Sequence, residues 1–225
     1  MELVRSCYLT TDYAPPEQAN ADCGPTDVRA LAADSGEELW RLEQSATSTL
    51  SFADGKLYLN TTQSQIIAID AATGEELWRR RVDAQTTDGI SSVVVIEDRL
   101  LIGASADAAE LSGGKFRGYL AALDLANGDP LWTSYTVPET ANGAGIFSSP
   151  GADVAARLAF GTTANNYGRP ATDSSDAFIA FDLDTGAIKW KFQAVVNDTF
   201  GGDPLDSTSP DYNFGAKAGH RRCTH

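Results

Sequence analysis

The chain has 225 residues, of which 42% are hydrophobic, and its 17 basic and 31 acidic residues give a net charge of −14 at pH 7. This much apolar material is enough for one sizeable globular core and argues against disorder. A surface so acidic repels nucleic acid phosphates and anionic membranes, so neither is an expected partner.

The first 27 residues are predicted to form an irregular N-terminal segment. Its opening, MELVRSCYLTTDYAPPEQ, lacks the basic stretch and apolar core of a signal peptide. No apolar run of about 18 residues occurs anywhere in the chain, so no membrane span is expected. Cys7 and Cys23 flank a proline-rich stretch. They either close a loop disulfide in an oxidising compartment or stay as two thiols, and the sequence leaves both alternatives open.

From residue 28 onward, one motif occurs four times. The copies are VRALAADSGEELW (28–40), IIAIDAATGEELW (66–78), YLAALDLANGDPLW (119–132) and AFIAFDLDTGAIKW (177–190). Each copy ends on one of the four tryptophans of the protein, and a glycine stands four residues before each tryptophan. An aspartate stands eight residues before the tryptophan in all but the first copy, where Ala32 replaces it.

The motif predicts a β-hairpin. Alternating apolar residues suit a half-buried strand, the aspartate accepts hydrogen bonds from turn amides, and the glycine supplies a positive φ. A second hairpin is expected before each of the last three copies, at 50–59, 93–103 and 150–161, the first with the turn signal Asp54–Gly55. Four short strands per repeat are typical of a β-propeller blade, with the tryptophans between blades. A β-sandwich built from regular hairpins is the alternative.

The tryptophans are 38, 54 and 58 residues apart, so the later repeats carry insertions at 104–118 and 162–176. Insertions on one face of a repeat protein commonly carry binding functions. Propellers close with about four to eight blades, so four motifs predict an incomplete arc and a chain that is a fragment. We expect a partial propeller of about four blades over residues 28–216 and an irregular tail over 217–225.

The motif A-x-D-x-x-T-G-x-x-x-W resembles the tryptophan-docking repeat of pyrroloquinoline quinone (PQQ) propellers. Those include quinoprotein alcohol dehydrogenases and a non-catalytic outer-membrane assembly lipoprotein. FRGYLAALDLANGDPLWTSYTVPE (116–139), GAGIFSSPGADVAARLAFGTTANNYG (143–168) and SPDYNFGA (209–216) are similar to segments of polyvinyl alcohol dehydrogenase-like quinoproteins. The resemblance implies an all-β fold, an arc of an eight-bladed propeller, and the cofactors PQQ and Ca²⁺.

The resemblance also implies roles for five residues. Glu110, Asn165 and Asn166 match metal ligands, and hard cations prefer such carboxylate and amide oxygens. Arg117 matches an arginine that pairs with PQQ carboxylates, and Phe147 stands in for a tryptophan that covers the PQQ ring. Each has a structural alternative: a solvated loop acid for Glu110, a turn for the asparagine pair, a strand-edge ion pair for Arg117 and core packing for Phe147.

The catalytic base is where the pattern departs from the family. After the last motif, NDTFGG places Asp198 at the first aspartate of the family's D-x-W-D run and Gly201 where the base is expected. Asp198 or Asp203 is the candidate substitute, although neither is in register. The adjacent cysteine pair common near PQQ is also absent, with Lys115 preceding the FRG segment.

Two functions therefore follow from the resemblance. The first is a fragment of a PQQ-dependent alcohol dehydrogenase that oxidises a small or polymeric alcohol and passes electrons to a cytochrome. The alternative is a non-catalytic propeller that binds other proteins. Either would place the chain in the periplasm or elsewhere outside the cytoplasm, although this chain shows no signal peptide.

Overall fold

The structure is a computed structural model that describes residues 27–44, 50–61, 65–83, 85, 93–106, 115–200 and 212, and the backbone of 2–5. Fifteen strands form within these ranges, and no helix there is long and apolar enough to cross a membrane. The strands make four antiparallel sheets, each ordered along the chain. The first sheet contains β1 (Glu2–Arg5), β2 (Val28–Leu31) and β3 (Glu38–Leu42). The second contains β4 (Ser51–Ala53), β5 (Lys56–Asn60), β6 (Gln65–Asp70) and β7 (Glu76–Arg81). The third contains β8 (Val94–Ile96), β9 (Arg99–Ala104), β10 (Tyr119–Asp124) and β11 (Pro130–Tyr135), and the fourth β12 (Gly151–Asp153), β13 (Leu158–Thr162), β14 (Ala177–Asp182) and β15 (Ile188–Gln193).

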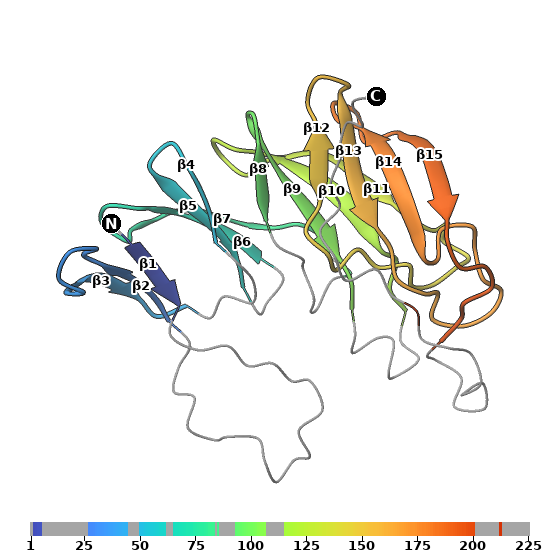
Figure 1. The fold of residues 1–225 in the computed structure, drawn as a ribbon, viewed down its shortest axis with the longest axis horizontal. Coiled ribbons are helices and arrows are strands. Elements are labelled where there is room, and N and C mark those ends of the chain that lie inside the picture. The colour runs from blue at the N-terminus through green and yellow to red at the C-terminus, as the bar shows by residue number, and fades with distance from the viewer. Residues whose placement is uncertain are drawn as a thin grey trace, which may run out of the picture.

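The four sheets fan out side by side into an arc (Figure 1). This is the predicted incomplete propeller, because each complete sheet is a four-stranded meander and successive sheets pack face to face. The sandwich alternative is wrong. Strand β1 lies within the N-terminal segment that was expected to be irregular, and it pairs with β2.

The predicted hairpin chemistry is confirmed at the turns. Asp54 and Gly55 both have positive φ, at 49° and 73°, as a two-residue hairpin between β4 and β5 requires. In the β6–β7 turn, one carboxylate oxygen of Asp70 accepts hydrogen bonds from the amides of Ala72 and Thr73, each at 2.9 Å. These bonds hold the pKa of Asp70 below its ordinary value. The motif aspartate therefore closes the turn, and this explains its recurrence.

The motif tryptophans join neighbouring sheets. The indole of Trp40 donates to the carbonyl of Ala71 in the next sheet at 3.0 Å, and Trp132 does the same to Leu183 at 3.1 Å. A Cβ added at Gly74 would lie 2.7 Å from the Trp40 ring, so only glycine lets the indole lie flat on the turn. Trp40 and Trp132 thus each cover the turn of the following sheet.

The junction between the second and third sheets is different. The Trp78 ring still lies on the turn of the next sheet, but its buried Nε1 has no hydrogen-bond partner in the described residues. The hydroxyl of Tyr58 instead donates to the Leu125 carbonyl at 3.3 Å. Leu125 follows the motif aspartate, as Ala71 does in the sheet before it, so a neighbouring aromatic residue takes over the docking bond.

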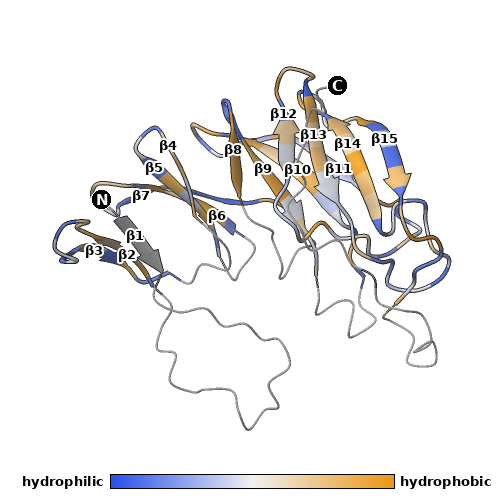
Figure 2. Ribbon diagram, viewed as in Figure 1, coloured by the Kyte–Doolittle hydropathy of each residue, from blue (hydrophilic) through white to orange (hydrophobic). Residues whose placement is uncertain are grey.

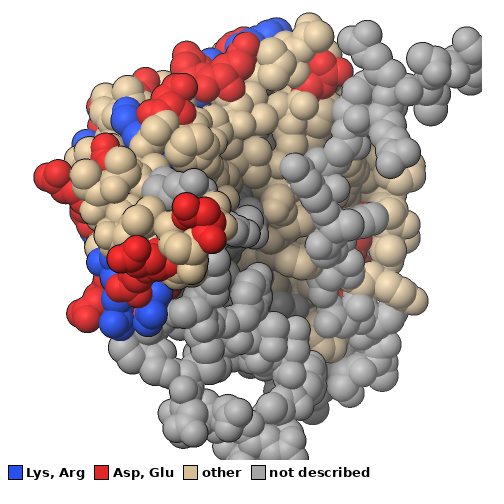
Figure 3. All heavy atoms as spheres, turned by 60° about the vertical axis from the view of Figure 1, so that its left-hand side comes forward, with Lys and Arg blue, Asp and Glu red and all other residues tan. Residues whose placement is uncertain are grey.

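The hydrophobic core lies between the sheets rather than in one central cluster. Three buried clusters each contain residues from two adjacent sheets, so every junction has a core of its own. The strands are apolar along much of their length, while the turns and outer strands are more polar (Figure 2). Asp and Glu side chains lie along the upper and left-hand margins of the view in Figure 3, with Lys and Arg side chains among them.

Candidate functional site

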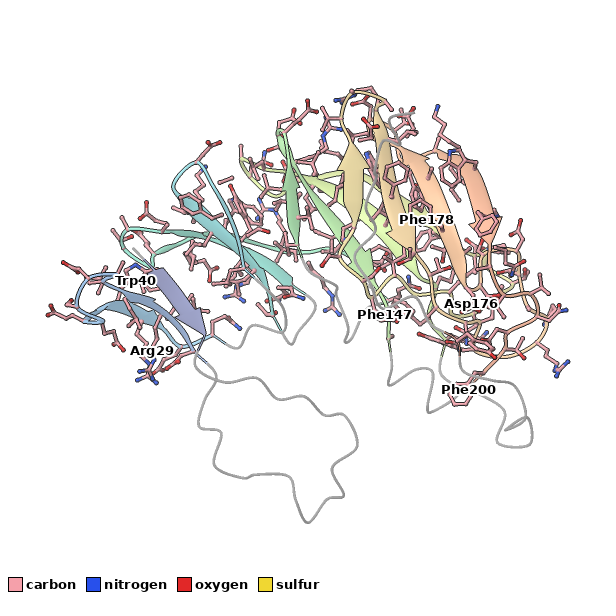
Figure 4. All side chains as sticks on the ribbon, in the orientation of Figure 1. Arg29, Trp40, Phe147, Asp176, Phe178 and Phe200 are labelled. Atoms are coloured by element: carbon pink, nitrogen blue, oxygen red, sulfur yellow. The ribbon has the colours of Figure 1, made fainter. Side chains whose placement is uncertain are left out.

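The insertions of the third and fourth repeats emerge at the same edge of the arc. They connect β9 to β10 and β13 to β14, whereas the motif turns connect β10 to β11 and β14 to β15. Because neighbouring strands are antiparallel, the described ends of both insertions lie at the edge opposite the motif turns. Phe147, Asp176 and Phe200 lie on this edge, which is the lower one in Figure 4.

A crossing segment, residues 142–147, holds this edge together. On one side Gly143 pairs with Arg117, and on the other side it pairs with Asn166. The amide of Gly118 donates to the Gly143 carbonyl at 2.9 Å, and the Ala144 amide donates to the Asn165 carbonyl at 2.7 Å. The crossing segment is thus an extra strand-like link between the third and fourth sheets.

Glycines make the crossing possible. A Cβ at Gly118 would lie 2.0 Å from the Ala144 carbonyl oxygen, and one at Gly143 would lie 2.5 Å from the Tyr167 nitrogen. Both distances are far inside van der Waals contact, and Gly143 also has a φ of +90°. No other residue allows the backbones to approach this closely. The crossing segment therefore depends on glycine at both positions.

Arg117 is anchored within the third sheet. Its Nε and Nη2 donate to the Val137 carbonyl at 3.1 and 2.8 Å, and its guanidinium lies 3.9 Å from the centre of the Tyr135 ring. Tyr135 in turn donates to Asp83 at 2.5 Å, and this bond with burial raises the pKa of Tyr135 to about 12. Among the described residues Arg117 makes no ion pair with an acid, so the strand-edge ion pair stays a prediction.

The two asparagines are buried and have different partners. Asn166 donates to the Asn142 carbonyl at 2.8 Å and accepts from the amide and hydroxyl of Thr172 at 2.7 and 3.0 Å. Its side chain therefore fixes the crossing segment and the following loop. Asn165 donates through Nδ2 to the Phe200 carbonyl at 2.7 Å. That bond uses the nitrogen of the amide, while the oxygen is the atom that a hard cation binds.

Asp198 is 2% exposed, and its carboxylate accepts hydrogen bonds from backbone amides. One of its carboxylate oxygens accepts from the Phe200 amide at 3.1 Å, and the other accepts from the Tyr212 amide at 3.1 Å. A general base needs a lone pair directed at its substrate. Both oxygens of Asp198 already accept backbone hydrogen bonds, an arrangement that suits a structural role.

Phe147 is 38% exposed at the end of the crossing segment, so it is not a fully buried core residue. The crossing brings Arg117, Asn165 and Asn166 together, and the Asp198 carbonyl accepts the Asn166 amide at 3.3 Å. Glu110, Gly201 and Asp203 lie outside the described residues, as do Cys7 and Cys23. Where these five lie relative to the site therefore stays a prediction.

Two residues at this edge were not anticipated from the sequence. Asn142 accepts the Phe116 amide through its side chain at 2.6 Å and starts the crossing segment. Its Asn-Gly dipeptide is a turn signal that could have indicated it. Asp176, the last residue of the insertion before β14, is an acid that is 1% exposed at a positive φ of 47°. Nothing in the segment DSSDAF distinguishes it from a surface acid.

The described residues fit the implied cofactors in part. PQQ carries carboxylates that favour guanidinium partners, and Nη1 of Arg117 makes no hydrogen bond within the described part of the chain. Phe147 presents an exposed aromatic surface at the same edge. For Ca²⁺, the buried amide oxygen of Asn165 has suitable chemistry, whereas no group of three or more His, Cys, Asp or Glu among the described residues is placed to hold a metal.

Comparison with known proteins agrees with this geometry. Residues 25–193 match the family model described as outer membrane protein assembly factor BamB. A polyvinylalcohol dehydrogenase of Sphingopyxis sp. strain 113P3 is 36% identical over 101 residues, which cover 38% of this chain and 15% of that protein. The dehydrogenase subunit of a quinone alcohol dehydrogenase from Acetobacter aceti is 32% identical over 191 residues, which cover 85% of this chain and 24% of that protein.

A solved structure gives the same fold. The quinohemoprotein alcohol dehydrogenase of Comamonas testosteroni superposes with a TM-score of 0.67 at 20% identity, covering 78% of this chain and 33% of that chain. The chain therefore spans a third or less of each of these relatives.

Proposed function

The chain belongs to the PQQ-type β-propeller repeat family, and we propose that it forms part of a PQQ-dependent alcohol dehydrogenase of the polyvinyl alcohol type. Its role is to supply one section of the cofactor site. The proposal rests on one observation: the crossing segment brings Arg117 and Asn165 to one edge of the arc and ends at an exposed Phe147. The proposed substrate is a small or polymeric alcohol.

Each residue would hold a different part of the cofactor. Arg117 would pair with a PQQ carboxylate through Nη1, the donor not used on Val137. Phe147 would cover the ring face. Asn165 would offer its amide oxygen to Ca²⁺, with Glu110 as the expected carboxylate ligand. When bound, PQQ supplies the two-electron acceptor for the alcohol. By family resemblance, a cytochrome then takes the electrons and the protein works in the periplasm.

Binding of PQQ is tested by titrating the purified chain with PQQ in the presence of Ca²⁺ while tryptophan fluorescence is followed. Replacing Arg117 with lysine removes the fork of donors. A hydrogen bond to a charged group contributes about 1.5–3 kcal/mol, so the dissociation constant should rise about 10- to 100-fold. The matched control is Arg79→Lys, on strand β7 far along the chain from the crossing segment. Equal effects of the two variants would contradict the assigned role.

The metal is tested by repeating the titration with and without Ca²⁺. Asn165→Ala should abolish the dependence of PQQ binding on Ca²⁺, whereas Asn127→Ala, in an exposed motif turn, should leave it intact. Dye-linked oxidation of polyvinyl alcohol and of short alcohols then measures activity. If Asn165→Ala keeps the full calcium dependence, Asn165 is not a ligand.

A second candidate function is a non-catalytic scaffold for protein binding. It is favoured by Asp198, whose two carboxylate oxygens both accept backbone amides, and by the family model, whose description names an assembly factor. This alternative predicts neither fluorescence quenching by PQQ nor alcohol oxidation. Quenching by PQQ that depends on Arg117 would exclude it.

A further inference from the structure

A short stretch of chain that follows the second sheet reaches the third sheet beside Arg117. Val82, the residue directly after β7, packs against a buried cluster that contains Phe116. The stretch then turns, because one carboxylate oxygen of Asp83 accepts the Gln85 amide at 2.8 Å. Strand β7 begins at its motif turn, so this stretch lies at the opposite edge of the arc, the edge of the proposed site.

The side chain of Gln85 fixes the backbone of Arg117. Its Nε2 donates to the Arg117 carbonyl at 3.0 Å, and its Oε1 accepts the Arg117 amide at 3.4 Å. One side chain thus uses both backbone hydrogen-bonding groups of Arg117, as a neighbouring strand would. The position of this residue is therefore set in part by the sheet before its own.

Asp83 fixes the aromatic ring that faces the guanidinium. Its second carboxylate oxygen accepts the Tyr135 hydroxyl at 2.5 Å, and the Arg117 guanidinium lies 3.9 Å from the centre of that ring. Tyr119 meets the same ring edge to face, with ring centres 6.0 Å apart. A carboxylate that accepts a phenol proton leaves the ring richer in electrons. The attraction between the ring face and a cation then becomes stronger.

Three residues therefore hold Arg117 from two sheets, and we call them the clamp: Asp83, Gln85 and Tyr135. We propose that the clamp positions the Arg117 guanidinium for a ligand carboxylate. This inference rests on the proposed function, in which Nη1 of Arg117 pairs with a carboxylate of PQQ. Arginine side chains are flexible, and ordering one during binding weakens affinity. The clamp and the Val137 carbonyl order this side chain during folding instead.

The same junction supplies a matched control. Tyr58 of the second sheet donates to the Leu125 carbonyl of the third sheet at 3.3 Å, at the edge of the motif turns. Tyr58→Phe and Tyr135→Phe therefore each remove one hydroxyl hydrogen bond between these two sheets. Only Tyr135→Phe alters the clamp. Asp83→Asn is a second clamp variant, which keeps an oxygen that can accept the hydroxyl and removes only the charge.

The clamp is tested first by NMR of the full chain labelled with ¹⁵N-arginine. The Arg117 signals are identified by their loss in Arg117→Lys, and circular dichroism checks that each variant folds. The Tyr135 ring should shift the guanidinium protons of Arg117 upfield. Tyr135→Phe and Asp83→Asn should each reduce this shift, whereas Tyr58→Phe should leave it unchanged. Arg117 signals that stay the same in both clamp variants would overturn the proposal.

Binding is tested with PQQ and with citrate, two probes that share carboxylates. Each should move the Arg117 signals. Tyr135→Phe should raise the dissociation constant of each probe that binds by about 2- to 12-fold, the scale expected for ordering one long side chain. In an Arg117→Lys background the same change should have no further effect, because the clamp acts through the guanidinium. Equal effects in both backgrounds indicate a purely structural role and would overturn the proposal.

The two probes separate this proposal from the proposed function. If citrate moves the Arg117 signals and PQQ does not, the cofactor assignment fails and the clamp stands. If neither probe moves them, Arg117 is not held for a carboxylate, and the proposal is overturned.

Discussion

Replacing Gly186 with alanine should destabilise the chain more than the same change at Gly36. Both glycines have left-handed backbone, with φ of +73° and +72°, so alanine should cost about 1–2 kcal/mol at either site. At Gly186 the new Cβ would also lie 2.6 Å from the Trp132 ring, whereas at Gly36 it meets open space. Trp132 is hydrogen-bonded to Leu183 and cannot move away freely. Overpacking of this kind costs a further 1–3 kcal/mol, roughly.

Thermal unfolding followed by circular dichroism measures the difference between the two variants. For a chain of this size, 1 kcal/mol shifts the melting temperature by roughly 2–4 °C, so Gly186→Ala should melt about 2–12 °C below Gly36→Ala. Equal melting temperatures would refute the idea that the ring contact, rather than the backbone conformation, requires glycine in the motif.

Three further predictions follow from single interactions. Trp40→Phe removes a docking hydrogen bond and should cost about 0.5–1.5 kcal/mol more in urea unfolding than Trp78→Phe, whose indole nitrogen has no described partner; equal costs would contradict this. A hydrogen bond from Lys189 is the main cause that lowers the pKa of Asp182 to about 2. The ionised Asp182 therefore stabilises the folded chain at pH values above the ordinary pKa of an aspartate, and this stabilisation is lost as the pH falls toward 2. Asp182→Asn should therefore flatten the acid limb of the melting-temperature profile, and an unchanged limb would argue against the bond. Absorbance titration should find one tyrosine with a pKa near 12, raised by Asp83; Tyr135→Phe should remove that step and no other.

Much of the arc could be predicted from the sequence because its information is local and repeated. The Asp-Gly turn between β4 and β5 and the aspartate-closed turn at Asp70 each depend on a few adjacent residues, and both appear as predicted. The motif tryptophans Trp40, Trp78 and Trp132 lie between sheets, as predicted. The motif also identified the family, which the family model confirms over residues 25–193. The prediction of a repeated blade was secure because a pattern that occurs four times in one sequence does not arise by chance.

The site was less predictable because its contacts join segments far apart in the chain. The sequence indicated Arg117, Phe147 and Asn165 through resemblance, but it did not indicate that residues 142–147 cross between two sheets and link them. Nor did it indicate that Asp198 is committed to the amides of Phe200 and Tyr212, the latter fourteen residues away. These hydrogen bonds depend on the paths that the loops take in the folded chain, and no local sequence pattern indicates those paths.

The sequence by itself therefore determined the blade: hairpin turns, strand alternation and the tryptophan that docks on the next turn, all of them short-range consequences of residue type. Only the tertiary structure decided which copies of that contact are made. Trp40 and Trp132 donate to the following sheet, and Tyr58 replaces Trp78 as donor. Among the described residues no following sheet lies on Trp190, which is 45% exposed. The physical reason is that docking depends on a neighbouring sheet and on the side chains beside the tryptophan, and both lie outside the motif itself.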